Sequence, residues 1–563
     1  MSMNPGETVH EKELSDVADV DDLHHFGYQQ SLKRVLGPYG SFAIAFSMIS
    51  ITTGIFFLLP SLFGTSGGVG VALWLPCAAG VFLIVMVYSH LAARIPITGF
   101  AYQWNSRLIS PHYGWFTGYT ALVAFIAGAT ATAAALASVF VPDIWKSPTH
   151  TDTVVFVCVT LAAAAVINIL SIKAVSAFNN WGVFFEIAGS VIAALMLIIG
   201  TMFFFKHDAG FSVLTSTVRT NHSSLWYGIV LSSLLPLYTF IGWEGAADLS
   251  EETLDPRATT PTAMIRANYV SVLASAIMII GFLIAIPKGI TAMLGQNKND
   301  LVYIFQYQFG QVASVILQVI VFIAIFSCVL ANMVVATRLC FALARDKMLP
   351  ASGILGKVND STATPIASIL LVLAVGIGIN LLSAGITANV ISIVSVAYYM
   401  IYLLTVGGAI YAYLKKKIPG RARATDFSLG RWFLPIAVVA ILYVSAVIVV
   451  ALAPQEGHVA GEYLLYTVLV GTAWYVFYLR GRINRQLAGV YRAEVTELEK
   501  LADAYIELDC APRFVGRSPT PDELKGASLR DAEVETLERY RVHLRNEVLT
   551  EVFLSLVAHD GDH

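Results

Sequence analysis

Charged residues are scarce in this chain. Asp, Glu, Lys and Arg make up 13% of its 563 residues, whereas hydrophobic residues make up 56%. A soluble chain of this length needs roughly 25% charged residues. The apolar residues also come in long blocks rather than in amphipathic alternation. This composition excludes an ordinary soluble protein and predicts an all-α polytopic membrane protein that is surrounded by the lipid bilayer.

Cysteine is sparse as well, and several signals of other protein classes are missing. The five cysteines are scattered and form no CxxC pair, so the sequence predicts neither a disulfide framework nor a metal cluster. It contains no phosphate-binding loop and no nucleotide motif. The apolar segments carry no His, Asp and Glu at metal-binding spacing and no paired nucleophile and base. We therefore expect no cofactor, no metal, no nucleic-acid partner and no enzymatic activity.

The N-terminal segment, residues 1–40, lacks the basic start and early apolar core of a cleaved signal peptide. It is acidic instead, with Glu7, Glu11 and Glu13 followed by four aspartates between residues 16 and 22. The first apolar segment is therefore expected to act as an uncleaved membrane anchor.

The long apolar segments predict a transmembrane domain over residues 41–480 with twelve spans. A tight turn of four residues separates the ninth span from the tenth. The spans are predicted at 41–63, 71–93, 115–141, 153–172, 181–205, 226–249, 268–287, 312–336, 365–383, 387–413, 432–453 and 461–479.

The charges of the loops predict the orientation, because Lys and Arg are retained on the cytoplasmic side. One set of alternate loops holds only Lys146, Lys206, Arg219, Lys288 and Lys298. All other Lys and Arg residues up to Arg485 lie in the opposite set. This asymmetry fits an even number of spans, with both termini in the cytoplasm.

Residues 481–563 differ in character from the spans. The stretches 491–508 and 529–556 are charged and have helical periodicity, and prolines and a glycine between them separate the two. We expect a small cytoplasmic helical tail. A solvated packing or assembly element is the simpler interpretation of it, and a regulatory element is the alternative.

Two spans carry a polar, flexible break near their middle. The first, 41–63, contains the sequence SITTG at 50–54, and the sixth, 226–249, contains TFIGWE at 239–244. A broken helix leaves backbone groups unpaired, and hydrocarbon tolerates this only where protein, water or a ligand satisfies them. A matched pair of interrupted spans, one opening each half, indicates the binding site of a secondary transporter.

Several short motifs occur in a characteristic order. They are TGIF at 53–56, PITGFAYQW at 96–104, FIGWE at 240–244 with SEET at 250–253, ATRL at 336–339 with ARDKMLP at 344–350, and FSLGRW at 427–432. Together they resemble the amino acid–polyamine–organocation (APC) superfamily, and most closely its amino acid/choline transporter branch. The chain departs from the family pattern at Phe100 and at Lys347, where the family usually has Gly. The resemblance covers about residues 26–480.

The resemblance implies the LeuT-like fold of five plus five spans in inverted repeat. The repeats would be about 41–205 and 226–413, the first and sixth spans would be the broken ones, and residues 432–479 would form two peripheral helices. The substrate would bind between the broken spans and become accessible to each side in turn.

The break in the first span predicts the site for a substrate carboxylate. The start of a half-helix presents free N–H groups and partial positive charge, which suit an anion. Small residues let the ligand approach these amides, and hydroxyl groups add hydrogen bonds. Small residues at a helix–helix contact are the alternative interpretation. The candidates are Ser50, Thr52, Thr53 and Gly54.

The break in the sixth span predicts carbonyl groups for the substrate's ammonium. Thr239, Ile241 and Gly242 supply this break. Phe240 and Trp243 flank it, and either ring could cover the substrate or bind a cation through its π face. Packing against neighbouring spans is an equally good interpretation for each ring. In the family the aromatic residue at the position of Phe240 tends to act as a gate.

Glu186 is the most informative charged residue, because it lies inside the fifth span. Intramembrane acids are costly and usually face the protein interior or a water path. Burial disfavours the charged carboxylate, which makes a proton-carrying role feasible. Binding of sodium or an amine and a purely structural role remain alternatives.

Three further residues are candidates for coupling or gating. Glu244 and Asp248 are four residues apart and therefore share a helix face on the cytoplasmic half of the sixth span. Glu244 is expected to organise the inner gate, and Asp248 to contact a cationic substrate. Glu251 and Glu252 are expected to pair with Arg345 or Arg338 at that gate, or else to be solvated surface charges. Asn332 in the eighth span is a possible sodium ligand, but no hydroxyl pair accompanies it, so protons are favoured over sodium.

These features predict a plasma-membrane permease that moves an amino acid or a small organic amine by alternating access, with proton symport favoured over sodium symport. The alternatives are an exchanger or exporter of similar substrates, and a transporter-like sensor that binds substrate without moving it. The sequence does not select among amino acids and amines, and it leaves the oligomeric state open.

Overall fold

The fold was analysed in a computed structural model of the chain. It describes residues 30–490 apart from 146, 206–209, 218–224, 288–298, 360, 383–386 and 453–454, together with residues 23, 26 and 28. Residues 30–490 belong to one compact unit. The predicted helical tail beyond residue 490 and most of the N-terminal segment lie outside the described residues.

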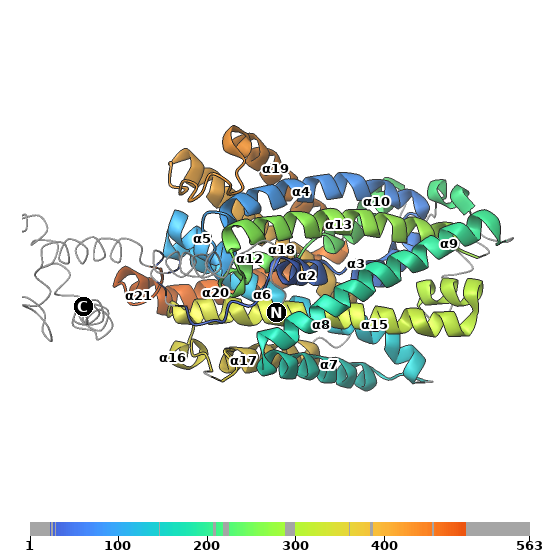
Figure 1. Ribbon diagram of the computed structural model, residues 1–563, viewed down its shortest axis with the longest axis horizontal. Helices are drawn as coiled ribbons and strands as arrows, with labels where there is room; N and C mark the ends of the chain where they lie inside the picture. Colours follow the sequence, from blue (N-terminus) through green and yellow to red (C-terminus); the bar gives the residue numbers. More distant parts are fainter. Residues whose placement is uncertain are drawn as a thin grey trace, which may run out of the picture. The chain divides into compact units, whose positions relative to one another are not determined.

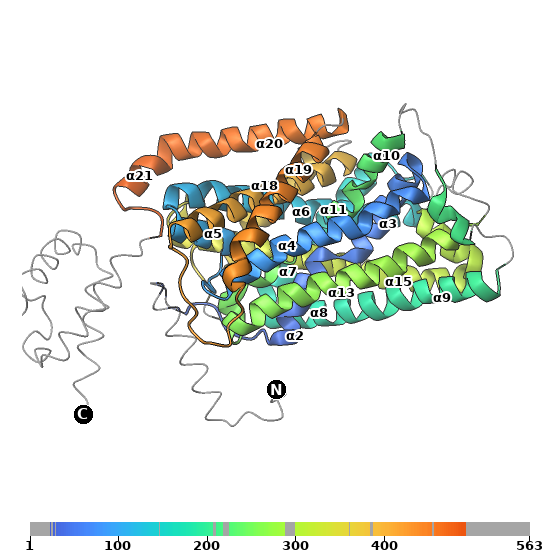
Figure 2. The same ribbon diagram turned by 90° about the horizontal axis from the view of Figure 1, so that it is seen from above.

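Long helices that run roughly side by side build this unit (Figures 1 and 2). The described residues are mostly helical and contain no β-strand beyond isolated bridges. In the first half the helices are α2 Pro38–Ile49, α3 Ile51–Thr65, η1 Gly68–Leu73, α4 Trp74–Ala92, α5 Phe100–Leu108, α6 Pro111–Ile144, α7 His150–Leu170, α8 Ile172–Phe184, η2 Phe185–Ser190 and α9 Val191–Phe203.

The second half begins with short helical pieces and continues with long ones. Gly310, at φ +83, bends α15 near its start. The elements are η3 Gly210–Thr215, α10 Leu225–Ser232, α11 Leu234–Thr239, α12 Gly245–Asp248, η4 Ser250–Glu252, α13 Pro256–Ile284, α15 Asp300–Arg345, α16 Ser352–Leu355, α17 Ile366–Leu382, α18 Thr387–Leu414, η5 Gly430–Trp432, α19 Phe433–Leu452, α20 Gln455–Trp474, η6 Tyr475–Leu479 and α21 Arg480–Asn484.

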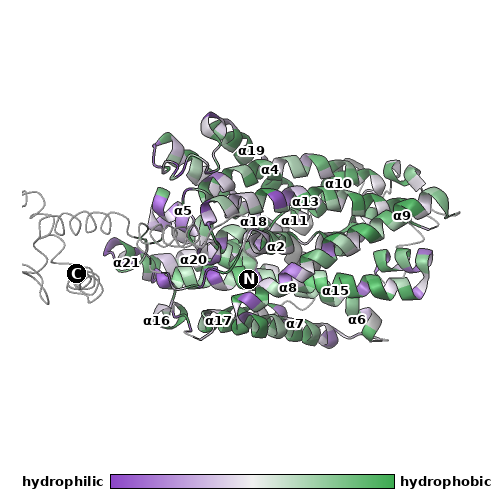
Figure 3. Cartoon of the chain, viewed as in Figure 1, coloured by the Kyte–Doolittle hydropathy of each residue, from purple (hydrophilic) through white to green (hydrophobic). Residues whose placement is uncertain are grey.

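The helices agree with a polytopic membrane protein. Nine helical segments within the described residues are long and apolar enough to cross a membrane, and two shorter apolar helices, Tyr227–Thr239 and Ile366–Leu381, coincide with the predicted sixth and ninth spans. Most of the helical ribbon is coloured hydrophobic, and hydrophilic residues are frequent near α5 and α21 (Figure 3). The polytopic helical class is confirmed, whereas the count of twelve spans and the inverted repeat stay predictions.

Both predicted helix breaks are confirmed. Ser50 adopts φ 40 and ψ 78, which ends α2 and starts α3. In the sixth predicted span, α11 ends at Thr239, Gly242 adopts φ +106, and α12 begins at Gly245. The two breaks lie against each other, because a Cβ atom on Gly242 would come within 2.8 Å of the Met48 carbonyl group at the end of α2.

Candidate functional site

The backbone groups exposed by the first break have partners within the protein. The Ser50 hydroxyl caps α3 by accepting a hydrogen bond from the Thr53 N–H at 3.3 Å, and it also lies 2.6 Å from the Thr53 hydroxyl. The Thr52 N–H donates to Glu186 Oε1 at 3.0 Å. All these groups are buried. The start of α3 therefore binds a carboxylate, as expected for a helix N-terminus, but this carboxylate belongs to the chain itself.

Glu186 reaches this position from a π-helical turn, Phe185–Ser190, in the middle of the fifth predicted span. Single π-helical turns inside helices are frequent at functional sites. The Ser50 hydroxyl lies 3.4 Å from Glu186 Oε1, and Ser190 places its hydroxyl 3.3 Å from that of Thr52. Glu186 Oε2 is buried and has no hydrogen-bond partner among the described residues. The carboxylate is thus tied to the first break through one oxygen only.

The second break is organised by a different acid. Glu244 Oε2 accepts hydrogen bonds from the Gly242 N–H at 3.2 Å and from the Tyr402 hydroxyl at 2.9 Å. Tyr402 belongs to α18, so this contact connects the break to the tenth predicted span. The position agrees with the expected organising role of Glu244, which stays a prediction.

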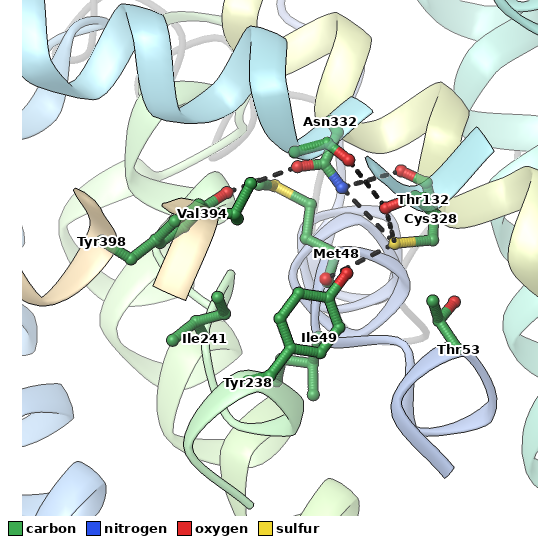
Figure 4. Close-up of a pocket in the computed structure, with 11 residues that line it drawn as sticks. Met48, Ile49, Thr53, Thr132, Tyr238, Ile241, Cys328, Asn332, Val394 and Tyr398 are labelled. Carbon is green, nitrogen blue, oxygen red and sulfur yellow. Dashed lines mark hydrogen bonds between the residues drawn. The ribbon is translucent and has the colours of Figure 1, made fainter. Parts of the chain in front are cut away.

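A small cavity lies between the two breaks (Figure 4). Its volume is about 10 Å³, which is room for about one water molecule. Residues of α2, α3, α6, α11, α15 and α18 and of the second break form its walls. They are Met48, Ile49, Thr53, Gly128, Thr132, Tyr238, Ile241, Cys328, Asn332, Val394 and Tyr398.

The polar groups of the cavity form a connected set (Figure 4). Asn332 donates to the Cys328 carbonyl at 3.0 Å and accepts from the Tyr398 hydroxyl at 3.3 Å. The Cys328 thiol lies 3.6 Å from the Met48 carbonyl and 3.7 Å from the Thr132 hydroxyl. The set joins α2, α6, α15 and α18, so a change in any of these side chains alters the wall of the cavity.

The predicted substrate-binding residues fall into three groups. Thr53 and Ile241, together with Asn332 from the predicted coupling set, line the cavity. The other residues of the two breaks do not line it, although Ser50 bonds to the lining residue Thr53 and Gly242 packs against the lining residue Met48. They are Ser50, Thr52, Gly54, Thr239 and Gly242.

Phe240 and Trp243 form the third group, because they pack against neighbouring helices. Phe240 contacts the ring of Trp74 edge-on, with centroids 4.8 Å apart. Trp243 stacks on Tyr402 at 5.4 Å and meets Tyr88 edge-on at 5.0 Å. Neither ring lines the cavity in this conformation. The geometry favours the packing interpretation, and a role in binding stays a prediction.

In this conformation Gly54 allows two helices to pack closely, and it does not expose its backbone N–H to a ligand. A Cβ atom on Gly54 would lie 2.3 Å from the Thr239 hydroxyl oxygen, so α3 and α11 touch at this point. Its N–H already donates to the Ser50 carbonyl at 3.1 Å. The contact brings α3 and α11 together next to Thr53 and Tyr238, which line the cavity.

Sequence reasoning missed most of the cavity wall. Tyr238 lies one residue before the predicted break, and Tyr398 and Cys328 lie in the tenth and eighth predicted spans. Proximity to a break was the one available signal, and it applied to Tyr238 and to Met48 and Ile49, which directly precede Ser50. The remaining wall residues are separated from the breaks by long stretches of sequence.

Buried ion pairs lie at the C-terminal end of the predicted sixth span. Arg338 binds both carboxylate oxygens of Glu252, at 3.1 and 2.9 Å, and both side chains are fully buried. Arg345 binds both oxygens of Glu251 at 2.9 Å. The predicted pairing of these acids with Arg338 and Arg345 is confirmed, and solvated surface charge is excluded for both glutamates.

The loop after α4 adds backbone donors to this network. The Thr98 N–H donates to Glu251 at 3.2 Å, and the Gly99 N–H donates to Asp248 Oδ1 at 2.9 Å. Asp248 Oδ2 has no partner among the described residues. Asp248 is buried and does not line the cavity, and its contact with a substrate stays a prediction.

A second set of contacts joins two of the sequence motifs. Asp346, after α15, accepts hydrogen bonds from the Tyr102 hydroxyl at 2.8 Å and from the Gln103 amide at 2.9 Å. Tyr102 and Gln103 belong to α5, a short buried helix that was not predicted. The motifs at 96–104 and 344–350 therefore form one structural unit with the ion pairs.

The segment before α2 pairs with the residues that follow η4. The N–H groups of Val35 and Leu36 donate to the Glu252 carbonyl at 2.9 Å, and the Leu254 N–H donates to the Leu36 carbonyl at 2.9 Å. This isolated parallel bridge between Leu36 and Thr253 connects the start of the first broken helix to the end of the second, on the side of the ion pairs.

Comparison with known proteins agrees with this arrangement. The family described as amino acid permease matches residues 36–474. An amino-acid permease BAT1 homolog of Oryza sativa subsp. japonica is 26% identical over 480 residues, covering 80% of this chain and 90% of the relative. Amino-acid permease BAT1 of Arabidopsis thaliana is 25% identical and covers 79% and 90%. Amino-acid permease 2 of Neurospora crassa is 21% identical and covers 80% and 84%.

Proposed function

This chain belongs to the amino acid permease family of membrane transporters, and we propose that it carries an amino acid or a small organic amine across the plasma membrane by alternating access. The observation that carries this proposal is the meeting of two broken helices around a small cavity. Broken spans at the centre of a bundle are the usual substrate site of secondary transporters.

The size of the cavity requires its walls to move. A volume of about 10 Å³ holds about one water molecule and no amino acid. The substrate therefore needs a conformation in which the helices that line the cavity lie farther apart. The pairs Arg338–Glu252 and Arg345–Glu251 act as the inner gate in this scheme, because they must part when the cytoplasmic side opens.

Glu186 supplies a physical reason for proton coupling. Its carboxylate occupies the Thr52 N–H at the start of α3, which is where a substrate carboxylate would bind. Two carboxylates that share one site cannot both remain ionised, because like charges at close range disfavour the charged forms. Binding of the substrate carboxylate would therefore favour a protonated Glu186, and substrate and proton would move together.

Uptake into proteoliposomes tests this function. The purified protein would be given labelled amino acids and amines, with and without an inward proton gradient, beside Glu186→Gln. We expect saturable uptake that the gradient stimulates in the natural protein and no longer stimulates in Glu186→Gln. The exposed Glu462→Gln, which makes the same chemical change in α20, is the matched control and should behave like the natural protein.

The other outcomes separate the alternatives. Uptake that ignores the gradient but requires internal substrate would indicate an exchanger, and counterflow from preloaded vesicles would then identify its partner substrate. Substrate-induced thermal stabilisation without any flux would refute transport and indicate a sensor. Stimulation that persists unchanged in Glu186→Gln would refute the coupling role of Glu186 and leave transport itself intact.

A further inference from the structure

A group of cations surrounds the connection between α18 and α19. It consists of Lys415, Lys416 and Lys417 directly after α18, Arg421 in the loop, and Arg431 at the start of the next helix, and all five are exposed. We call these five residues the basic loop cluster. None of them contributes to the cavity, the helix breaks or the inner ion pairs described above.

The cluster is held in place rather than carried on a free loop. The rings of Tyr413 and Phe433 stack at 5.0 Å, which brings the end of α18 to the start of α19. Arg94, at the end of α4, donates to the Phe427 carbonyl at 2.8 Å and to the Ser428 hydroxyl at 2.9 Å. The two groups of cations at either end of the loop therefore lie close together in a defined arrangement.

The positive charge of the cluster is not balanced nearby. The carboxylates of this region, Asp255 and Asp426, both bind Arg423, at 2.7 and 3.0 Å. Within the described ranges no carboxylate forms an ion pair with a member of the cluster. Burial lowers the pKa of Arg94 to about 10; the nearby charge of Arg421 adds to this shift, and the charge of Asp426 opposes it.

The cluster also lies at the expected edge of the hydrocarbon region. The segments Val394–Leu414 and Gly430–Leu452 are apolar enough to cross a membrane. The cluster lies at the end of the first segment, in the loop that follows it, and at the start of the second segment. Lys417 Nζ is 5.6 Å from the centre of the Tyr411 ring, and the Arg431 guanidinium is 5.8 Å from that of Trp432. Exposed Tyr and Trp rings are typical of the membrane–water interface.

We propose that the basic loop cluster binds the headgroups of anionic phospholipids. Four to eight cations directly beside a membrane span attract anionic lipids, with about 1 kcal/mol for each Lys or Arg near the surface. The dipole of α18 explains a preference for cations at 415–417, but not the presence of Arg421 and Arg431 beyond the helix. A soluble acidic partner would have to bind beside side chains that face hydrocarbon.

Native mass spectrometry of the full-length protein tests the proposal. The protein would be equilibrated in detergent with equal amounts of phosphatidylglycerol and phosphatidylcholine, and the bound lipids counted. The test variant replaces Lys415, Lys416 and Lys417 with Gln. We expect the natural protein to bind more phosphatidylglycerol than phosphatidylcholine. In the variant, the ratio of bound phosphatidylglycerol to bound phosphatidylcholine should fall by at least about tenfold. An excess of inorganic phosphate should not displace the lipid.

A matched control removes the same charge without touching the cluster. Lys173, Lys347 and Lys357 are also exposed, but they lie in three separate places, and their replacement by Gln should leave the lipid preference within about twofold of the natural value. If the triple variant at 415–417 does not fold, the exposed Arg431→Gln alone should still lower the preference severalfold.

Three results would overturn the proposal. The first is an equal loss of preference in the control variant, which would indicate a general effect of net charge. The second is an unchanged preference after replacement of the cluster residues. The third is no preference in the natural protein, the result expected if an acidic segment of the chain's own ends covers the cluster. Transport assays are not part of this test, so it is independent of the proposed function.

Discussion

The ion pair between Arg338 and Glu252 offers a quantitative prediction. Both side chains are fully buried, and two hydrogen bonds of 3.1 and 2.9 Å connect them. Arg338→Gln removes the positive charge and leaves a buried carboxylate without its partner. Removing one partner of a buried ion pair lowers the free energy of unfolding by about 3–5 kcal/mol. We therefore expect the free energy of unfolding of this variant to fall by about that amount.

Removing both charges should recover much of the loss. A neutral pair of similar volume often replaces a buried ion pair at little cost, because no charge then needs to be desolvated. The double variant Glu252→Gln with Arg338→Gln should lie within about 2 kcal/mol of the natural protein. Arg345→Gln should cost less than Arg338→Gln, because the Arg345 side chain is 15% exposed and the Thr98 N–H still binds Glu251.

Unfolding of the purified variants in detergent, followed by circular dichroism against added denaturing detergent, would measure these differences. The complete double-mutant cycle separates the interaction energy from the effects of the single changes. The reasoning would be refuted if Arg338→Gln lowered the stability by less than about 1 kcal/mol, or if the double variant were as unstable as the sum of the two single variants.

Three further predictions follow from single positions. Gly54→Ala should abolish uptake without preventing membrane insertion, because the new methyl group would lie 2.3 Å from the Thr239 hydroxyl, and normal uptake would contradict the close contact. Lys347→Gly should raise the free energy of unfolding by about 1 kcal/mol, because Lys347 has φ 58 and this backbone region costs residues other than Gly about 1–2 kcal/mol. A denaturation curve that shows no gain in stability would contradict this prediction. Saturating substrate should slow the alkylation of Cys328 several-fold, because Cys328 lines the cavity. Peptide mass spectrometry would measure the rate of alkylation, and equal rates with and without substrate would place the substrate site elsewhere.

The positions of the breaks could be predicted from the sequence, but their backbone geometry could not. Polar and small residues inside an apolar span indicate a break, and both breaks occur where they were expected. The left-handed residue of the first break is Ser50, although Gly54 was the more flexible candidate. Gly54 is required instead by the proximity of Thr239, a tertiary contact that no local pattern encodes.

The inner ion pairs were predictable for a similar reason, whereas the cavity was not. Charged residues near the end of an apolar span have few possible partners, so the pairing of Glu251 and Glu252 with arginines could be anticipated. The cavity wall comes from six helices, and most of its residues are ordinary apolar or hydroxyl side chains. Which of these face the breaks depends on how the helices rotate against one another.

The family resemblance also indicated two unusual backbone positions. Phe100 and Lys347 stand where the family usually has Gly, and both adopt positive φ, 25 and 58 respectively. Phe100 is fully buried against the rings of Tyr88 and Trp104. A departure from a glycine pattern thus marked residues in uncommon backbone conformations, but the sequence could not show which contacts hold Phe100 in place.

The short bridge between Leu36 and Thr253 has a mechanical consequence. Three backbone hydrogen bonds of 2.9 Å fasten the chain just before α2 to the residues just after η4. A displacement of α2 therefore displaces the end of the other broken helix as well, and we expect α2 and α12 to move together as one rigid unit. Spin labels on α2 and α12 should keep a constant separation during the transport cycle, while their distances to α5 change together.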